Sequence, residues 1–215
     1  MIYKAVIFDL DGTLVNSIED LADAMNKVLT SNNYPTHSYD AYKYFVGSGI
    51  RSLVIKALPE NQRDDAQINS CFEAMVSIYS KECINKTKPY AGIIDLLNQL
   101  KARNLKLSVL SNKADVLTKK ITLALFPDYF EPILGLKLEA HKKPNPVVVL
   151  DMCKKLNIQP EEAMYVGDTA IDMQTANNAN MLAVGVPWGF RDKKELIENG
   201  AKHILNHPLD LIALL

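Results

Sequence analysis

Short apolar runs alternate with longer amphipathic stretches along most of this chain. The first run, Ala5–Phe8, has no polar position and stops at a carboxylate, as a strand buried on both faces of a parallel sheet does. Comparable runs recur at Leu105–Leu110, Tyr129–Leu134, Ala163–Val166 and Leu182–Val186. Helical spacing is found at Gly92–Arg103, Ala114–Leu125, Pro146–Leu156 and Ala170–Ala179. This alternation predicts an α/β fold with a doubly wound parallel sheet.

One long stretch, from about Ser17 to about Lys86, shows only helical periodicity. Ser17 is placed as a helix N-cap, and two apolar stripes follow, Ile18, Leu21, Ala22, Met25 and Leu29, then Phe72, Met75, Val76 and Tyr79. About 70 residues are too many for a loop. We therefore predict that residues 17–86 form an inserted small helical cap, and that residues 1–16 and 87–215 form the core domain.

The composition excludes several classes of protein. Of 215 residues, 48% are apolar and 23% charged, which excludes a wholly disordered chain. The 24 basic and 25 acidic residues leave a net charge of −1, so nothing favours nucleic acid or an anionic membrane as a partner. No apolar run approaches a membrane span, and the 3 cysteines have no paired spacing. We expect a cytoplasmic monomer or homodimer that acts on a small molecule.

Two pairs of aspartates follow predicted strands. Asp9 and Asp11 are two apart on an extended segment, so they face the same way, and Gly12 and Thr13 add a tight turn and a hydroxyl. Asp168 follows the strand Ala163–Val166 in the same manner. Parallel strands bring their carboxyl ends to one edge of the sheet, where ligands bind.

Asp172 comes one helical turn after Asp168 and completes the second pair. Four carboxylates at one sheet edge repel each other unless a cation lies among them. Ligands that are all oxygen, with no His or Cys nearby in sequence, favour Mg²⁺. The alternative is that these aspartates only cap helices.

Two further segments offer partners for an anion. Ser111, Asn112 and Lys113 follow a predicted strand, and we expect them to open a helix whose amides bind a phosphate. Lys142 and Lys143 lie in a loop that prolines stiffen, so one lysine is expected to point inward against the carboxylates. The alternatives are an ordinary N-cap and solvated lysines.

These four segments, in this order, resemble the haloacid dehalogenase-like hydrolase superfamily, and the resemblance covers the whole chain. It implies a Rossmann-like core with a helical cap, and an enzyme that uses Mg²⁺. Asp9 would be the nucleophile, Asp11 the general acid and base, and Ser111 and Lys143 the phosphoryl-binding pair. Mg²⁺ would be held by Asp9, the backbone carbonyl of Asp11, Asp168 and, in support, Asp172. Gly12, Thr13 and Asn112 would line the phosphate side of the substrate.

Within the superfamily, three segments resemble bacterial phosphoglycolate phosphatases: Phe45–Leu53, Lys88–Gly92 and Val186–Arg191. Pro187 and Asn180 depart from the pattern of those relatives. In the cap, we predict that Gly47, Ser48, Gly49 and Arg51 bind substrate, because glycines allow close approach and an arginine fork suits a carboxylate. The alternative is a plain turn with a solvated arginine.

The predicted activity is Mg²⁺-dependent hydrolysis of a small phosphate monoester, with 2-phosphoglycolate as the favoured substrate, through an aspartyl-phosphate intermediate. A phosphomutase, a pyrophosphatase or a nucleotidase would use the same scaffold. A dehalogenase needs one nucleophilic aspartate and no metal, so it would not explain Asp11 and Asp168. A receiver-type phosphoacceptor domain shares the residue types, but it lacks a helical insert of about 70 residues.

Overall fold

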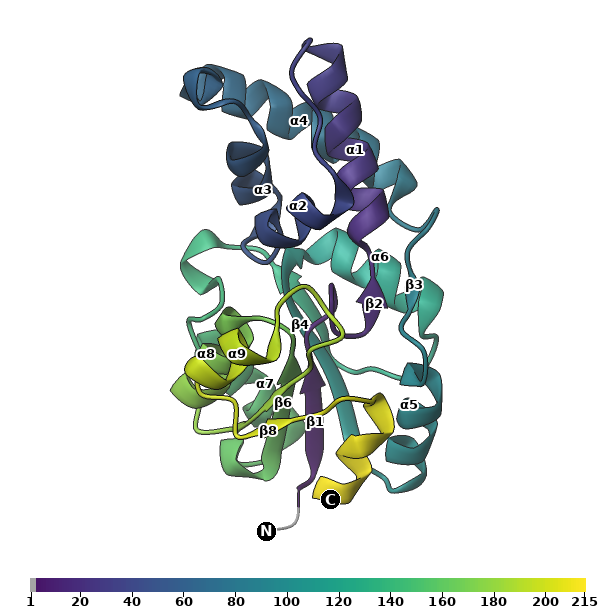
Figure 1. Cartoon of the computed structure of the whole chain (residues 1–215). Coiled ribbons are helices and arrows are strands. Elements are labelled where there is room, and N and C mark those ends of the chain that lie inside the picture. Colours follow the sequence, from purple (N-terminus) through teal and green to yellow (C-terminus); the bar gives the residue numbers. More distant parts are fainter. Residues whose placement is uncertain (1–2) are drawn as a thin grey trace. The chain divides into compact units, whose positions relative to one another are not determined.

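A computed structural model describes residues 3–215 and divides the chain into two compact units (Figure 1). One unit contains the chain up to Val15 and from Pro89 to Leu215, and the other contains Asn16–Lys88. None of the helices within residues 3–215 has the length and apolarity that a membrane crossing needs.

The first unit contains a six-stranded sheet in the order β5-β4-β1-β6-β7-β8, and every pair of neighbours is parallel. Its strands are β1 (Ala5–Phe8), β4 (Lys106–Ala114), β5 (Ile133–Leu136), β6 (Ala163–Gly167), β7 (Leu182–Gly185) and β8 (His203–Ile204). The central strand β1 sets the register, since Ile7 pairs with Ser108 on one side and with Tyr165 on the other. The carboxyl ends of β4, β1 and β6 therefore lie side by side.

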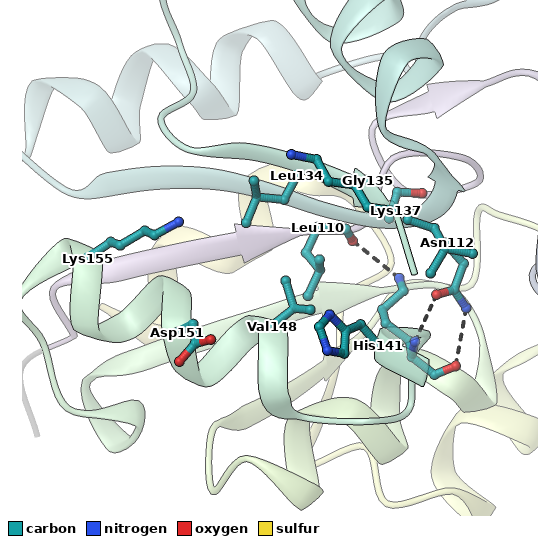
Figure 2. A pocket seen from close by; sticks show the side chains of 12 residues that line it. Leu110, Asn112, Leu134, Gly135, Lys137, His141, Val148, Asp151 and Lys155 are labelled. Carbon is teal, nitrogen blue, oxygen red and sulfur yellow. Dashed lines mark hydrogen bonds between the residues drawn. The ribbon is translucent and has the colours of Figure 1, made fainter. Parts of the chain in front are cut away.

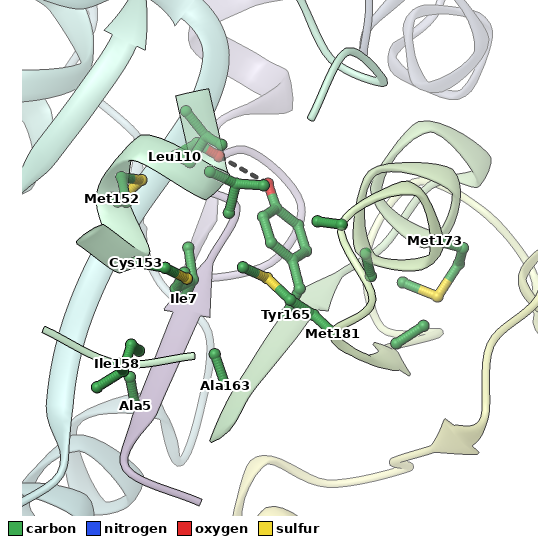
Figure 3. Close-up of a cluster of buried hydrophobic side chains, with 14 of the residues drawn as sticks. Ala5, Ile7, Leu110, Met152, Cys153, Ile158, Ala163, Tyr165, Met173 and Met181 are labelled. Carbon is green, nitrogen blue, oxygen red and sulfur yellow. Dashed lines mark hydrogen bonds between the residues drawn. The ribbon is translucent and has the colours of Figure 1, made fainter. Parts of the chain in front are cut away.

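Helices follow the strands of this unit, namely α5 (Ile93–Ala102), α6 (Asp115–Leu125), α7 (Val147–Leu156), α8 (Ala170–Asn178) and α9 (Lys193–Glu198). Short 3₁₀ helices occur at η2 (Glu139–His141), η3 (Pro160–Glu162) and η4 (Pro208–Leu214). Buried side chains of α7, α8 and α9 form one cluster with Ile7 and Tyr165 (Figure 3). Phe8, the next residue on β1, instead meets Phe130 edge to face at 6.0 Å. Successive residues of β1 thus pack in different directions, as a strand buried on both faces requires.

The second unit is helical, with α1 (Ile18–Ser31), α2 (Tyr39–Phe45), α3 (Gly49–Ala57), the 3₁₀ helix η1 (Glu60–Gln62) and α4 (Asp65–Glu82). Helix α1 packs against α2 and α4, and α3 packs against α4. The buried carboxylate of Asp20 accepts hydrogen bonds from the backbone N–H of Lys86 and from both the N–H and the hydroxyl of Thr87. This contact ties the start of the unit to its end. The two connecting segments, β2 (Val15–Asn16) and β3 (Lys88–Pro89), pair with each other.

The predicted fold class, a doubly wound parallel sheet with a small helical cap, is confirmed, with three local corrections. The strand predicted at Tyr129–Leu134 begins only at Ile133, directly after Pro132, which has no backbone N–H to donate to the sheet. The strand predicted to end at Leu110 continues to Ala114. Ser17 is the N-cap residue of α1, but its side chain makes no capping hydrogen bond. The 3 cysteines are buried, and none of them forms a disulfide within residues 3–215.

Candidate active site

The core unit gathers three aspartates at the carboxyl edge of its sheet. Asp9 follows β1, and its backbone N–H donates to the Val166 carbonyl of β6 at 2.9 Å, which aligns the two strand ends. Asp168 follows β6, and Asp172 lies in the first turn of α8. Each aspartate offers a carboxylate oxygen within 4.8 Å of the others, and all three are buried. Asp9, Asp168 and Asp172, which the sequence predicts to lie close together, thus meet in one small volume.

A single lysine neutralises part of this charge. Lys143 lies in the loop between η2 and α7, and its Nζ is 2.9 Å from Asp9 Oδ1 and 2.7 Å from Asp172 Oδ1. Lys142 instead pairs with Glu139 at the surface. The loop is held by Asn112, whose Oδ1 accepts from the Lys143 N–H at 2.8 Å and whose Nδ2 donates to the Lys143 carbonyl at 3.3 Å. The structure therefore selects Lys143 as the inward-pointing lysine.

The electrostatics of this cluster leave room for a further positive charge. Burial raises the pKa of Asp9 to about 6, although the charge of Lys143 opposes the shift. Burial and the charges of Asp172 and Asp9 raise the pKa of Asp168 well above its ordinary value. Burial lowers the pKa of Lys143, but the same two carboxylates outweigh it and raise that pKa well above its usual range. One ammonium does not compensate three carboxylates, so the cluster favours binding a cation.

The carboxylate oxygens of the three aspartates have different partners. Asp168 accepts from the Thr13 hydroxyl at 3.0 Å and from the Phe190 N–H at 2.8 Å. Asp172 accepts from both the N–H and the hydroxyl of Thr169, so it does cap α8 while it pairs with Lys143. Asp9 Oδ1, by contrast, is buried and has the Lys143 ammonium, 2.9 Å away, as its ionic partner. A buried carboxylate that meets charge rather than neutral donors fits a metal ligand or a nucleophile.

Asp11 has a separate partner that the sequence analysis did not identify. Lys113 Nζ lies 2.8 Å from Asp11 Oδ2, with the lysine side chain 3% exposed and the aspartate side chain 11% exposed. The carboxylate of Asp11 is not one of the three clustered carboxylates. Ser111 and Lys113 are two apart on the extended end of β4, a spacing that places them on one side of the strand and was available as a signal.

The expectation that Ser111, Asn112 and Lys113 open a helix is wrong. All three lie within β4, whose register with β5 shifts between Leu110 and Ala114, and α6 begins only at Asp115. The buried hydroxyl of Ser111 accepts from the Lys113 N–H at 3.3 Å. Any anion bound here would therefore meet a strand end rather than a helix N-terminus.

Gly12 and Thr13 shape the acidic cluster. Gly12 has φ +88, and a Cβ added to it would lie 2.2 Å from Asp168 Oδ2, so only glycine fits. Thr13 directs its hydroxyl at Asp168, and its carbonyl accepts from Trp188 Nε1 at 3.1 Å. Trp188 and Phe190 come from the segment Val186–Arg191, which thereby braces the turn after β1.

A small cavity of about 190 Å³ adjoins the site within the core unit (Figure 2). Asn112 lies at one end of it, and Asp151 and Lys155 lie at the other (Figure 2). Lys143 also lines the cavity. The wall between the two ends includes Val148. Two of the predicted site residues thus border an open volume, and Ser111 borders it as well.

The predicted cap residues belong to the helical unit. Gly47, in the turn between α2 and α3, and Gly49, the first residue of α3, have positive φ, of 112 and 80. Ser48 is the N-cap residue of α3 without a side-chain capping bond, and Arg51 donates to Asn69 Oδ1 at 2.7 Å. These four residues form a turn and the first turn of a helix, and their contact with substrate stays a prediction.

Comparison with known proteins identifies the family. The family model of haloacid dehalogenase-like hydrolases matches residues 6–186 of this chain. This chain belongs to the haloacid dehalogenase-like hydrolases.

Individual relatives of this hydrolase resemble it in sequence, and one solved structure also resembles it in fold. A phosphoglycolate phosphatase from Psychrobacter arcticus is 36% identical over 195 residues, which cover 87% of this chain and 84% of the relative. One from Aquifex aeolicus is 33% identical, with 99% of this chain and 96% of the relative covered. A crystal structure of a candidate phosphoglycolate phosphatase from Lactobacillus delbrueckii subsp. bulgaricus has a TM-score of 0.91 and 31% identity, over 98% of this chain and 97% of that one.

The ammonium of Lys143 is expected to stabilise the folded hydrolase. Lys143→Met would leave the buried carboxylates without their ammonium, so we expect a loss of about 3–5 kcal/mol in the free energy of unfolding. Urea unfolding in metal-free buffer measures it. Lys137→Met is the control, because Lys137 is 64% exposed and 3.6 Å from Asp115, where an ion pair contributes at most about 1 kcal/mol. Equal losses for both variants would contradict the compensating role of Lys143.

Proposed function

We propose that this haloacid dehalogenase-like phosphatase hydrolyses 2-phosphoglycolate through an aspartyl-phosphate intermediate, with Mg²⁺ as its cofactor. The observation that carries the proposal is Asp9, a carboxylate at the end of β1 that has the Lys143 ammonium 2.9 Å from Oδ1 and shares one small volume with Asp168 and Asp172. A carboxylate is a nucleophile, and a phosphate dianion needs nearby positive charge.

In the first step, a carboxylate oxygen of Asp9 attacks phosphorus while the bond to the leaving oxygen breaks. The leaving oxygen takes a proton from Asp11, which must be protonated at that moment. In the second step, Asp11 accepts a proton from water, whose oxygen attacks the aspartyl phosphate and releases inorganic phosphate. Lys113, paired with Asp11 at 2.8 Å, restrains the carboxylate that handles both protons. Lys143 and Ser111 would stabilise charge on the phosphoryl oxygens.

The residues present fit a Mg²⁺ ion. The buried oxygens of Asp9, Asp168 and Asp172 lie within 4.8 Å of each other, and the donor set is all oxygen. Asp9 and Asp168 would hold the ion, together with the backbone carbonyl of Asp11, while Asp172 supports them through Lys143. When bound, the ion supplies positive charge that offsets the repulsion between the nucleophile and the phosphate.

The substrate is proposed from the relatives and from Arg51. The relatives from Psychrobacter arcticus and Aquifex aeolicus are named phosphoglycolate phosphatases. A substrate with a carboxylate beside its phosphate suits an arginine, and Arg51 is an exposed arginine whose other partner is the neutral amide of Asn69. The proposal requires this guanidinium to bind the carboxylate of the substrate.

A substrate panel tests the activity. We expect the highest kcat/KM for 2-phosphoglycolate among 2-phosphoglycolate, pyrophosphate, nucleoside monophosphates and hexose phosphates. A preference for pyrophosphate or nucleotides would overturn the substrate assignment. Isomerised hexose phosphate among the products would identify a phosphomutase instead.

Arg51→Ala tests the selectivity separately from the chemistry. We expect it to weaken transition-state binding of 2-phosphoglycolate by about 1–3 kcal/mol, as the loss of a charged hydrogen bond does, and to leave p-nitrophenyl phosphate almost unchanged. The ratio of kcat/KM values for the two substrates measures the effect. Asn69→Ala is the control, since it removes the neighbour of Arg51 and keeps the guanidinium. Equal losses on both substrates would show that Arg51 supports the helical unit.

A further inference from the structure

The segment Pro187–Phe190 follows β7 and runs directly against Asp168 and the turn after β1. A Cβ added to Gly189 would lie 2.3 Å from the Gly12 carbonyl oxygen and 2.4 Å from the Cβ of Asp168. Neither a backbone carbonyl nor the fully buried side chain of Asp168 can yield to such a contact. The backbone of this segment therefore passes at a distance that only a residue without a side chain allows.

This segment and the turn together fix the carboxylate of Asp168. Its Oδ1 accepts from the Thr13 hydroxyl at 3.0 Å, and its Oδ2 accepts from the Phe190 N–H at 2.8 Å. Each carboxylate oxygen has a further lone pair, so both contacts leave room for a metal ion. The direction of Asp168 therefore depends on how firmly Thr13 and Phe190 are held.

Trp188 connects these two neighbours of Asp168. It precedes Phe190 by two residues, and its half-buried indole donates from Nε1 to the Thr13 carbonyl at 3.1 Å, across 175 residues of sequence. Thr13 is thus held at its carbonyl by Trp188 while its hydroxyl is directed at Asp168. An indole N–H can only donate, and packing of the ring alone would not require it.

We propose that Trp188 is a positioning residue for the Mg²⁺ site. Its hydrogen bond fixes the turn Gly12–Thr13, and with it the backbone carbonyl of Asp11, which precedes this turn, and the hydroxyl that orients Asp168. Ligands that are already in place lose little conformational entropy when an ion binds, so this restraint raises the affinity for the ion. The inference rests on the proposed use of Mg²⁺ by Asp11 and Asp168.

Trp188→Phe tests the hydrogen bond, because it keeps an aromatic ring at this position and removes the donor. We expect the Kd for Mg²⁺ to rise about fivefold, which is the effect of one lost hydrogen bond. The rise in thermal unfolding temperature with Mg²⁺ concentration gives this Kd in the absence of substrate. Phosphatase activity that is lost at low Mg²⁺ should return as Mg²⁺ is raised, because the variant retains every proposed ligand.

Replacement of one atom separates the hydrogen bond from the packing of the ring. Trp188 is the only tryptophan of the chain, so a tryptophan-auxotrophic host supplied with β-(benzothiophen-3-yl)alanine exchanges the indole N–H for sulfur at this residue alone. The sulfur of that ring does not donate a hydrogen bond, and the shape of the side chain is almost unchanged. The Kd for Mg²⁺ should again rise about fivefold. This protein decides the outcome if Trp188→Phe does not fold.

The control is Tyr129→Phe. Tyr129 is also a half-buried aromatic residue of the core unit, and its hydroxyl donates to Asn98 Oδ1 at 2.6 Å. The substitution removes one donor and keeps the ring, but neither Tyr129 nor Asn98 belongs to the acidic cluster. The Kd of this variant for Mg²⁺ should match that of the wild type.

A measurement on the wild-type protein needs no substitution at Trp188. The single indole gives one ¹H–¹⁵N resonance, which belongs to Trp188. Titration with Mg²⁺ should shift this resonance with the Kd obtained from the unfolding temperatures, and Asp168→Asn should lose the response. A resonance that saturating Mg²⁺ does not move would overturn the inference.

The outcomes separate this inference from the proposed function. An unchanged Kd in folded Trp188→Phe and in the benzothiophene protein would overturn the role of Trp188 and leave the proposed phosphatase activity untouched. Equal rises in Trp188→Phe and Tyr129→Phe would also overturn it, since the effect would then be one of general stability. A wild-type protein that binds Mg²⁺ but hydrolyses no phosphate ester would refute the proposed function, and the Kd values would still test Trp188.

Discussion

Asp9→Asn is expected to lower kcat by more than about 10⁴-fold, because an amide oxygen does not form the acyl phosphate. The protein should stay folded, since the substitution removes one negative charge from a buried cluster in which a single ammonium faces the carboxylates of Asp9 and Asp172. Turnover of p-nitrophenyl phosphate measures the loss. Borohydride reduction during turnover should label Asp9 in the wild-type protein, and peptide mass spectrometry should find no label in the variant.

A matched control for this substitution is Asp40→Asn. The side chain of Asp40 is 85% exposed and pairs with its helical neighbour Lys43, so its loss should leave kcat unchanged. Near-normal turnover by Asp9→Asn would refute Asp9 as the nucleophile. Retention of the borohydride label in that variant would place the covalent step on another carboxylate.

Removal of divalent cations with a chelator is expected to lower phosphatase activity by at least about 10³-fold, and Mg²⁺ should restore it. Without a cation, Asp9 and Asp172 share the ammonium of Lys143, and burial holds the pKa of Asp168 well above its ordinary value. Ca²⁺ should restore little, because it takes more ligands at longer distances. Initial rates across a titration of each metal provide the measurement.

Two controls make this result specific. Chelator that is already saturated with Mg²⁺ should not inhibit. Mg²⁺ should also raise the thermal unfolding temperature of the wild-type protein by binding only the folded state, and this rise should disappear in Asp168→Asn. Full activity in excess chelator would overturn the metal assignment, whereas a rise in unfolding temperature that persists in Asp168→Asn would place the ion away from Asp168.

Several features of the site were predictable because they depend on local pattern. Asp9 and Asp168 each end an apolar run, and parallel strands place such ends at a common edge. The pair Lys142 and Lys143 was identified, but not which lysine points inward. That choice depends on Asn112, whose side chain holds the Lys143 backbone from 31 residues away in sequence.

Other features were missed because a neighbouring strand creates them. The sequence analysis placed a helix start at Ser111, since the polar run after Leu110 looks like an N-cap. In the structure β4 continues to Ala114, and this extension brings Lys113 to Asp11. A strand end gains hydrogen bonds from the strand beside it, and local residue preference does not include that contribution.

By itself the sequence determined the α/β class, the helical insert and the acidic edge, because hydrophobic period and strand-end residues act within a few positions of each other. Only the tertiary structure decided how charge and protons are shared there. Lys143 and Tyr165 are 22 residues apart, and Tyr165 and Leu110 are 55 apart. Their hydrogen bonds exist because the strand order places β6 beside β1 and β1 beside β4. A tyrosine in a strand that looks apolar in sequence thereby gains polar partners from other segments.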